Sequence, residues 1–351
     1  MQNKSLQKNE WIESVRVLAM LLIIMFHIPS SDLPQASNTS LSHYILSFFH
    51  SPGASFTAIF FFIAGYFTKR NMTYSKWLKK IISLLVPFII WNTLCSFGLN
   101  DEATFSRIYG IGNSSLIPAD YPFWFILAII YMTLLWPIWR LAPEVALAVC
   151  LSFTQWNNSW LYDIFRGGLP PPNAFSLFLI GVILSRIPLK QLQQYIVYGF
   201  PIFMTLHIID LYYITFPVIL SLLNSAFMIM SGMALCAKLC PRVISFIAKF
   251  SCYVFLSYAS HAPLIIILGY IYLAGKTATS DNILAHSPAL IALVIFAANA
   301  AAFRIMQRYV PGILPYIAHY GQLPWLQKNK DRSTSVLSSL FFTIRNLIYS
   351  L

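Results

Sequence analysis

Long apolar stretches separated by short polar connections fill most of this chain, and they limit what it can fold into. Of its 351 residues, 58% are hydrophobic and 10% are charged, whereas a soluble domain carries about 25% charged residues. So few charged side chains cannot cover a water-exposed surface. A helix needs about 20 apolar residues to cross the hydrocarbon core of a bilayer. The composition therefore predicts an all-α integral membrane protein.

Ten segments have the length and apolar character of membrane-spanning helices, and we find no internal repeat and no long soluble domain. They cover residues 11–28, 55–68, 81–97, 121–139, 145–162, 173–185, 192–209, 217–237, 250–273 and 283–303. The sequence thus predicts a ten-helix transmembrane domain at residues 1–310 and a cytoplasmic tail at 311–351. Residues 336–351 have the pattern of an amphipathic helix on the membrane surface, with a loosely ordered tail as the alternative.

The positions of lysine and arginine predict the orientation of the spans. With a cytoplasmic N-terminus, ten alternating spans place 19 of these residues on the cytoplasmic side and 3 on the opposite side. This asymmetry is the positive-inside pattern, and it predicts that both termini are cytoplasmic. The net charge of +12 then reflects topology, not a nucleic-acid-binding face. The first segment lacks a clear cleavage site after its apolar run, so we expect it to be retained.

The first apolar segment contains two ionisable residues, Arg16 and His27, separated by ten apolar residues. Their eleven-residue separation corresponds to about 16 Å along a helix, and both positions fall on one face. Glu13 precedes Arg16 by three residues and can pair with its guanidinium. Ionisable groups within a span usually mark a pathway or a site. The alternative is that Arg16 is a snorkelling anchor and His27 an interfacial residue.

Several further motifs accompany this stripe. The stretch "FFFIAGYFTKR" ends the second segment, "YPFWF" opens the fourth with Trp124, and "FLSYASHAPL" places Tyr258, His261 and Pro263 in the ninth. In this order, and with Glu13, Arg16 and His27 in the first segment, the motifs resemble those of the acyltransferase-3 family of bacterial membrane O-acetyltransferases. The chain departs from the family's Ser-Gly-Tyr/Phe motif, because alanine stands at position 64 where the family has serine.

The resemblance implies transfer of an acetyl group from acetyl-CoA to a hydroxyl of a surface polysaccharide or its lipid-linked precursor, in the bacterial inner membrane. His27 is then expected to act as the general base, because neutral imidazole accepts a hydroxyl proton. Arg16, oriented by Glu13, is expected to hold the donor. Lys69 and Arg70 are candidates for binding the CoA phosphates, although a role in topology or lipid-headgroup binding is the alternative. No metal and no nucleic acid are expected.

Three aromatic or imidazole residues are candidates for binding the acceptor. Trp124 offers a stacking surface for a sugar ring, but an aromatic belt at the membrane interface also uses tryptophan. Tyr258 and His261, one helical turn apart, are expected to line the acceptor site or to form a structural hydrogen bond within the bundle.

Two other classes of membrane protein remain open at this point. A transporter or a flippase of lipid-linked sugars also has about ten spans and a few intramembrane charges, usually with broken helices at matching positions. The proline-rich break before the sixth segment has no counterpart in the first half. A glycan polymerase or ligase would be expected to carry a larger external loop than this chain has.

Overall fold

The computed structural model describes residues 9–27, 53–98, 124–154, 171–214, 216–261, 264 and 288–317, which are helical apart from short turns and contain no strand. The predicted surface helix at 336–351 lies outside these residues. The elements are α1 (Glu10–His27), α3 (Gly53–Tyr66), α4 (Tyr74–Gly98), α6 (Trp124–Leu134), α7 (Trp136–Trp139), α8 (Pro143–Thr154), α10 (Pro171–Leu184), α11 (Leu189–Tyr212), α12 (Val218–Leu239), α13 (Pro241–Ala248), the 3-10 helix η1 (Lys249–Tyr253), α15 (Pro288–Tyr309), η3 (Pro311–Ile313) and α16 (Leu314–Ile317).

Four helices in the described part of the chain are long and apolar enough to cross a membrane. They are Leu189–Asp210, Val218–Leu239, Pro241–His261 and Leu290–Tyr309. Shorter apolar helices cover Phe56–Tyr66, Phe125–Leu134, Pro143–Thr154 and Pro172–Leu184. The predicted all-α class is confirmed, whereas the number of ten spans and the sides of the termini remain predictions.

Proline sets several of the helix boundaries. Because proline has no amide hydrogen and a fixed φ, it suits the first position of a helix. Pro143, Pro171, Pro241 and Pro288 each open a helix at that position. Pro241 explains why the ninth apolar segment begins at residue 241 in the structure and not at 250 as predicted.

A proline also divides the predicted fourth segment into α6 and α7. Pro137 cannot donate a hydrogen bond to the carbonyl of Thr133, four residues earlier, so the α6 ladder ends near this point. The Thr133 carbonyl instead accepts a hydrogen bond of 2.6 Å from the indole nitrogen of Trp77 in α4. The break therefore provides a polar link between α4 and α6.

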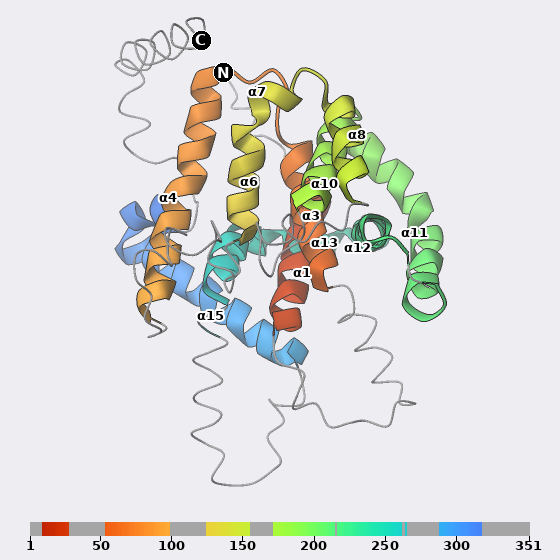
Figure 1. Cartoon of the computed structure of the whole chain (residues 1–351). Coiled ribbons are helices and arrows are strands. Elements are labelled where there is room, and N and C mark those ends of the chain that lie inside the picture. The colour runs from red at the N-terminus through yellow and green to blue at the C-terminus, as the bar shows by residue number, and fades with distance from the viewer. Residues whose placement is uncertain are drawn as a thin grey trace, which may run out of the picture.

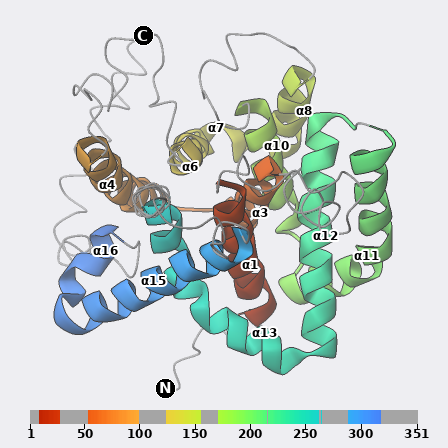
Figure 2. The same cartoon turned by 90° about the horizontal axis from the view of Figure 1, so that it is seen from below.

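The helix α1 lies near the centre of the molecule (Figures 1 and 2) and contacts α3, α12, α13, η1 and α15. In Figure 1, α4, α6 and α10 are seen along their length and α12 end-on, while Figure 2 shows α12 along its length. Thus α12 runs across the direction of those helices. One end of α1 is fixed to α13, since the buried Ser14 hydroxyl lies 2.8 Å from the Ile244 carbonyl and Ser245 donates to the Glu10 carboxylate at 3.1 Å.

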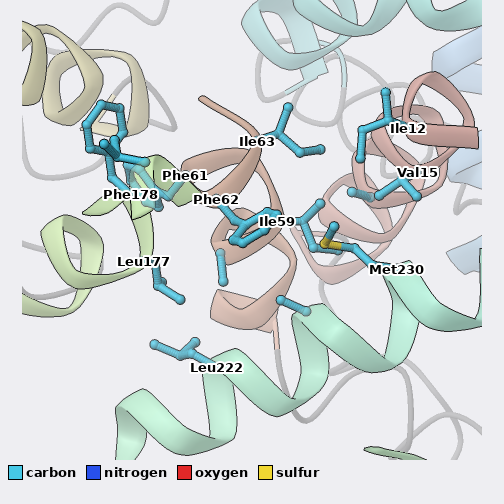
Figure 3. Packing of buried hydrophobic residues seen from close by; sticks show 14 of the residues in the cluster. Ile12, Val15, Ile59, Phe61, Phe62, Ile63, Leu177, Phe178, Leu222 and Met230 are labelled. Carbon is cyan, nitrogen blue, oxygen red and sulfur yellow. The ribbon is translucent and has the colours of Figure 1, made fainter. Parts of the chain in front are cut away.

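Two apolar clusters form the core, and α1 contributes to both. The first contains Ile12 and Val15 of α1 together with side chains of α3, α10 and α12, as Figure 3 shows. The second contains Ile23 and Ile24 of α1 together with side chains of α4, α6 and α15 and residues 253–259. Apolar side chains of α1 are therefore buried against neighbouring helices in both clusters, and this packing fixes α1 within the bundle.

The backbones of α3 and α10 come into direct contact through two glycines. A Cβ atom built on Gly65 would overlap the carbonyl oxygen of Phe178, and one built on Gly181 would overlap the carbonyl oxygen of Phe62. Glycine lets helices approach this closely because it has no side chain. The Tyr66 hydroxyl, next to Gly65, donates a hydrogen bond of 2.5 Å to the Ile187 carbonyl. Gly65 and Tyr66 of the motif in the second segment thus have structural roles.

Candidate functional site

The carboxylate and guanidinium of α1 form an ion pair, as their spacing predicts. Glu13 Oε2 accepts a hydrogen bond of 3.0 Å from Arg16 Nη1. The side chain of Arg16 is 34% exposed and that of Glu13 is 17% exposed. The pair therefore lies at the edge of the protein interior, where the guanidinium can contact a ligand while Glu13 fixes its position.

The helix α1 continues without a break from Arg16 to His27, so the two positions fall on one helix face. Between them on this face lie Met20, Ile23 and Ile24, each at most 1% exposed. The face that joins the two ionisable positions is thus covered by protein. The structure describes the backbone of His27 as the last residue of α1, and its catalytic role remains a prediction.

Tyr258 and His261 lie on the helical residues 254–261; Tyr258 belongs to the second cluster, and His261 is buried. The Nδ1 atom of His261 is 2.6 Å from the Tyr258 carbonyl oxygen. A carbonyl can only accept, so Nδ1 carries the proton and donates, and the Nε2 atom of neutral His261 has the acceptor lone pair. The predicted link between these residues therefore exists through the backbone of Tyr258.

The ring of Tyr258 packs against Phe125 of α6, which in turn packs against α3. Its centroid lies 5.4 Å from that of Phe125, which in turn lies 5.8 Å from Phe60 and 4.7 Å from Phe61. Trp124 precedes Phe125 as the first residue of α6, and its side chain is outside the described part of the structure. The fold thus brings the start of α6 and Tyr258 into contact with the cluster that also contains the second half of α1.

Two polar links join residues 253–261 to α15. The buried Ser260 hydroxyl is 2.6 Å from Asn299 Oδ1, and Arg304 Nε donates to the Tyr253 hydroxyl at 2.9 Å. Asn299 also donates from Nδ2 to the Ile295 carbonyl at 3.0 Å. These contacts position His261, which adjoins Ser260, relative to α15.

We expect Asn299→Leu to weaken this positioning, because it removes the link from α15 to the buried Ser260 hydroxyl at nearly constant side-chain volume, while Ser260 keeps its contact of 2.8 Å with the Leu256 carbonyl. Hydrogen bonds between membrane helices contribute about 0.6–2 kcal/mol, so thermal unfolding in detergent should show a loss of that size. Asn224→Leu is the matched control. Asn224 is also buried, but its side-chain amide makes no hydrogen bond within the described structure. Equal losses for the two variants would contradict a bracing role for Asn299.

The family comparison decides the class of the protein. The model of the acyltransferase domain family (Acyl_transf_3) matches residues 9–305, which includes every helix that forms the two clusters up to α15. The chain belongs to this family. No curated protein and no solved structure matches the chain.

A separate basic region of the acyltransferase lies at the connection between α3 and α4. Arg70 donates from Nε to the Arg140 carbonyl at 3.2 Å and from Nη2 to the Leu141 carbonyl at 3.3 Å. The indole nitrogen of Trp136 donates to the Lys69 carbonyl at 3.3 Å, and the Lys69 side chain is exposed. Arg70 therefore ties this connection to the turn between α7 and α8. Lys69 and Arg70 belong to neither apolar cluster that contains α1.

The sequence interpretation gave Arg140 no role beyond topology, and it did not predict the contact between Lys80 and Thr68. The guanidinium of Arg140 lies 4.3 Å from the Trp136 ring centroid and 5.2 Å from that of Tyr74, and it donates to the Tyr74 hydroxyl at 3.2 Å. Lys80 Nζ lies 2.6 Å from Thr68 Oγ1. The sequence signal for Lys80 was the lysine cluster beside Trp77, which was interpreted as binding CoA phosphates or, as the alternative, as a signal of topology and lipid-headgroup binding.

The described residues of the acyltransferase contain no cluster of three or more histidine, cysteine, aspartate or glutamate side chains that would hold a metal ion.

Proposed function

We propose that this acyltransferase transfers an acetyl group from cytoplasmic acetyl-CoA to a hydroxyl of a cell-surface polysaccharide, or of its lipid-linked precursor, in the bacterial inner membrane. The observation that carries the proposal is the Glu13–Arg16 ion pair on an unbroken α1 that ends at His27. The family assignment supplies the acyl transfer. The donor, the acceptor and the base are the parts that we add.

In the proposed reaction the acceptor oxygen attacks the carbonyl carbon of the thioester, and His27 takes the hydroxyl proton. The carbon–sulfur bond then breaks, and the CoA thiolate leaves and takes up the proton. Arg16 lies about 16 Å along α1 from His27, whereas a group that stabilises the oxyanion must be about 3 Å away. Arg16 is therefore assigned to holding the donor, with Glu13 orienting its guanidinium.

Membranes that contain the protein should transfer label from acetyl-CoA radiolabelled in its acetyl group to a glycan acceptor, and mass spectrometry should find the added acetyl group on the product. Membranes from cells without the gene provide the background. A transporter or flippase would change the distribution of the glycan across the membrane without changing its mass. Unmodified glycan from membranes with verified protein would therefore overturn the proposal.

Among variants of the ion pair, we expect Arg16→Met to raise the KM for acetyl-CoA by about tenfold, because a charge-assisted hydrogen bond contributes about 1.5–3 kcal/mol. Glu13→Gln should raise KM less, since it only loosens the guanidinium. Arg186→Met is the matched control, because it removes the guanidinium of the exposed ion pair between Arg186 and Glu144. An equal rise in KM for Arg186→Met would mean that surface charge, not Arg16, binds the donor.

A further inference from the structure

The connection between α3 and α4 and the turn between α7 and α8 are rich in cations. Residues 66–80 and 136–142 contain six lysine and arginine residues and no carboxylate. Glu144, which follows this turn, hydrogen-bonds to Arg186 and also interacts electrostatically with Arg70. This one carboxylate offsets only part of the positive charge of the region.

Arg70 and Arg140, the two arginines of this region, already make contacts within the protein. Arg70 is bound to the carbonyls of the α7–α8 turn, and Arg140 is stacked on Trp136. A guanidinium held by carbonyls and aromatic rings has fewer free donors for a ligand. The Nε–H of Arg140 has no hydrogen-bond partner among the described residues, but it is buried and closed to a ligand. The lysines therefore carry the donors that a ligand can reach.

Lys80 differs from the other lysines because its ammonium is directed to a buried hydroxyl. Its Nζ atom lies 2.6 Å from Thr68 Oγ1, and Thr68 is 3% exposed. The Thr68 hydroxyl itself donates to the Ala64 carbonyl at 2.6 Å, so it accepts from Lys80. This arrangement fixes the ammonium at the end of α3.

An ammonium has three donors, and Thr68 accepts from one of them. Lys80 forms no ion pair with any carboxylate among the described residues. A partly buried cation with a neutral partner is under-compensated, because removal from water is offset only when charge and hydrogen bonds are both satisfied. Lys80 therefore has donors available for an anion with several acceptor oxygens.

We propose that Lys80, held by Thr68, binds a phosphate group at the end of α3 and the start of α4. Lysine binds phosphate as a point charge, and the surrounding cations raise the local concentration of anions. The phosphate comes either from the nucleotide part of a CoA-type donor or from a phospholipid headgroup. Only the assignment to the donor rests on the proposed function.

The test uses the full-length protein in nanodiscs of phosphatidylcholine, with binding measured by isothermal titration calorimetry. The probes are CoA and adenosine 3′,5′-bisphosphate. Lys80→Met should weaken the binding of both probes by about tenfold or more, whereas Lys80→Arg should retain it within about threefold. Lys76→Met removes an exposed lysine one helical turn away, and a twofold change or less is expected. Thr68→Val keeps the charge but removes the hydroxyl, and it should weaken binding several-fold even if Lys80→Met does not fold.

A second arm titrates phosphatidylglycerol into detergent-solubilised protein and follows bound lipid by native mass spectrometry. Loss of this lipid in Lys80→Met, with no binding of the CoA probes by the wild type, would support the phosphate site and assign it to a headgroup. That result would count against acetyl-CoA as donor. Acetyl transfer by the wild type with unchanged probe and lipid binding in Lys80→Met would overturn the phosphate site and leave the proposed function intact. Equal losses in Lys76→Met and Lys80→Met would also overturn it, because a diffuse basic surface would then explain the binding.

Discussion

Gly65→Ala should prevent α3 and α10 from packing as they do in this structure. The added methyl group would meet the carbonyl oxygen of Phe178, which is a backbone atom and cannot rotate away as a side chain can. Overpacking in a filled core costs about 1–3 kcal/mol when side chains can adjust, and we expect at least the upper end of this range here. Gly181→Ala should have the same effect, because its methyl group would meet the Phe62 carbonyl. The measurement is the yield of monodisperse protein in detergent and its thermal unfolding temperature.

Gly232→Ala is the control for this prediction. A Cβ atom at Gly232 would lie 3.1 Å from a ring carbon of Phe200, which is the far end of a side chain and can shift. Alanine also favours a helix over glycine by about 1 kcal/mol, so this variant should be nearly neutral. Normal yield and stability of Gly65→Ala would show that α3 and α10 are not in backbone contact.

His27→Ala should reduce acetyl transfer by at least about a hundredfold, because a positioned general base contributes about 10²–10⁴ to the rate. The loss should be in kcat, with the KM for acetyl-CoA nearly unchanged, since the donor is assigned to Arg16. This pattern is the opposite of that expected for Arg16→Met. The experiment measures initial rates over a range of acetyl-CoA concentrations in membranes with matched protein levels.

Thermal unfolding of purified His27→Ala separates a catalytic defect from a folding defect. Wild-type stability together with a hundredfold lower kcat would support the role of base. Wild-type kcat would exclude His27 as the base, and His261, which is linked to the start of α6 through Tyr258, would then be the next residue to test.

The sequence predicted that the chain is helical and roughly where the helices lie, because both follow from the length of the apolar stretches. The first segment was expected at residues 11–28, and α1 covers Glu10–His27. Predicted helix ends were wrong where a property other than hydropathy determines the end of the helix. The third apolar segment was expected at residues 81–97, but α4 begins at Tyr74 and includes the lysines at positions 76, 79 and 80 in its first turns.

For the candidate site, local spacing predicted the Glu13–Arg16 pair, because both residues belong to one helix. Contacts between distant segments were not predictable in this way. The hydrogen bond between Ser260 and Asn299 and that between Thr68 and Lys80 depend on how helices cross. Hydropathy identifies a buried face but does not identify its partner helix. The glycines at positions 65 and 181 gave a signal, since small residues favour close helix contacts, but nothing in the sequence paired them.

The glycine contact between α3 and α10 also limits how this enzyme can change shape during a reaction cycle. Two backbones in van der Waals contact cannot slide or rotate past each other without losing that fit. Entry of a donor and exit of a product must then be accommodated elsewhere, where helices meet through side chains that can change rotamer. Side chains form the contacts among the second half of α1, α15 and the segment that ends at His261. We therefore expect conformational changes in this part of the protein, while the α3–α10 pair stays rigid.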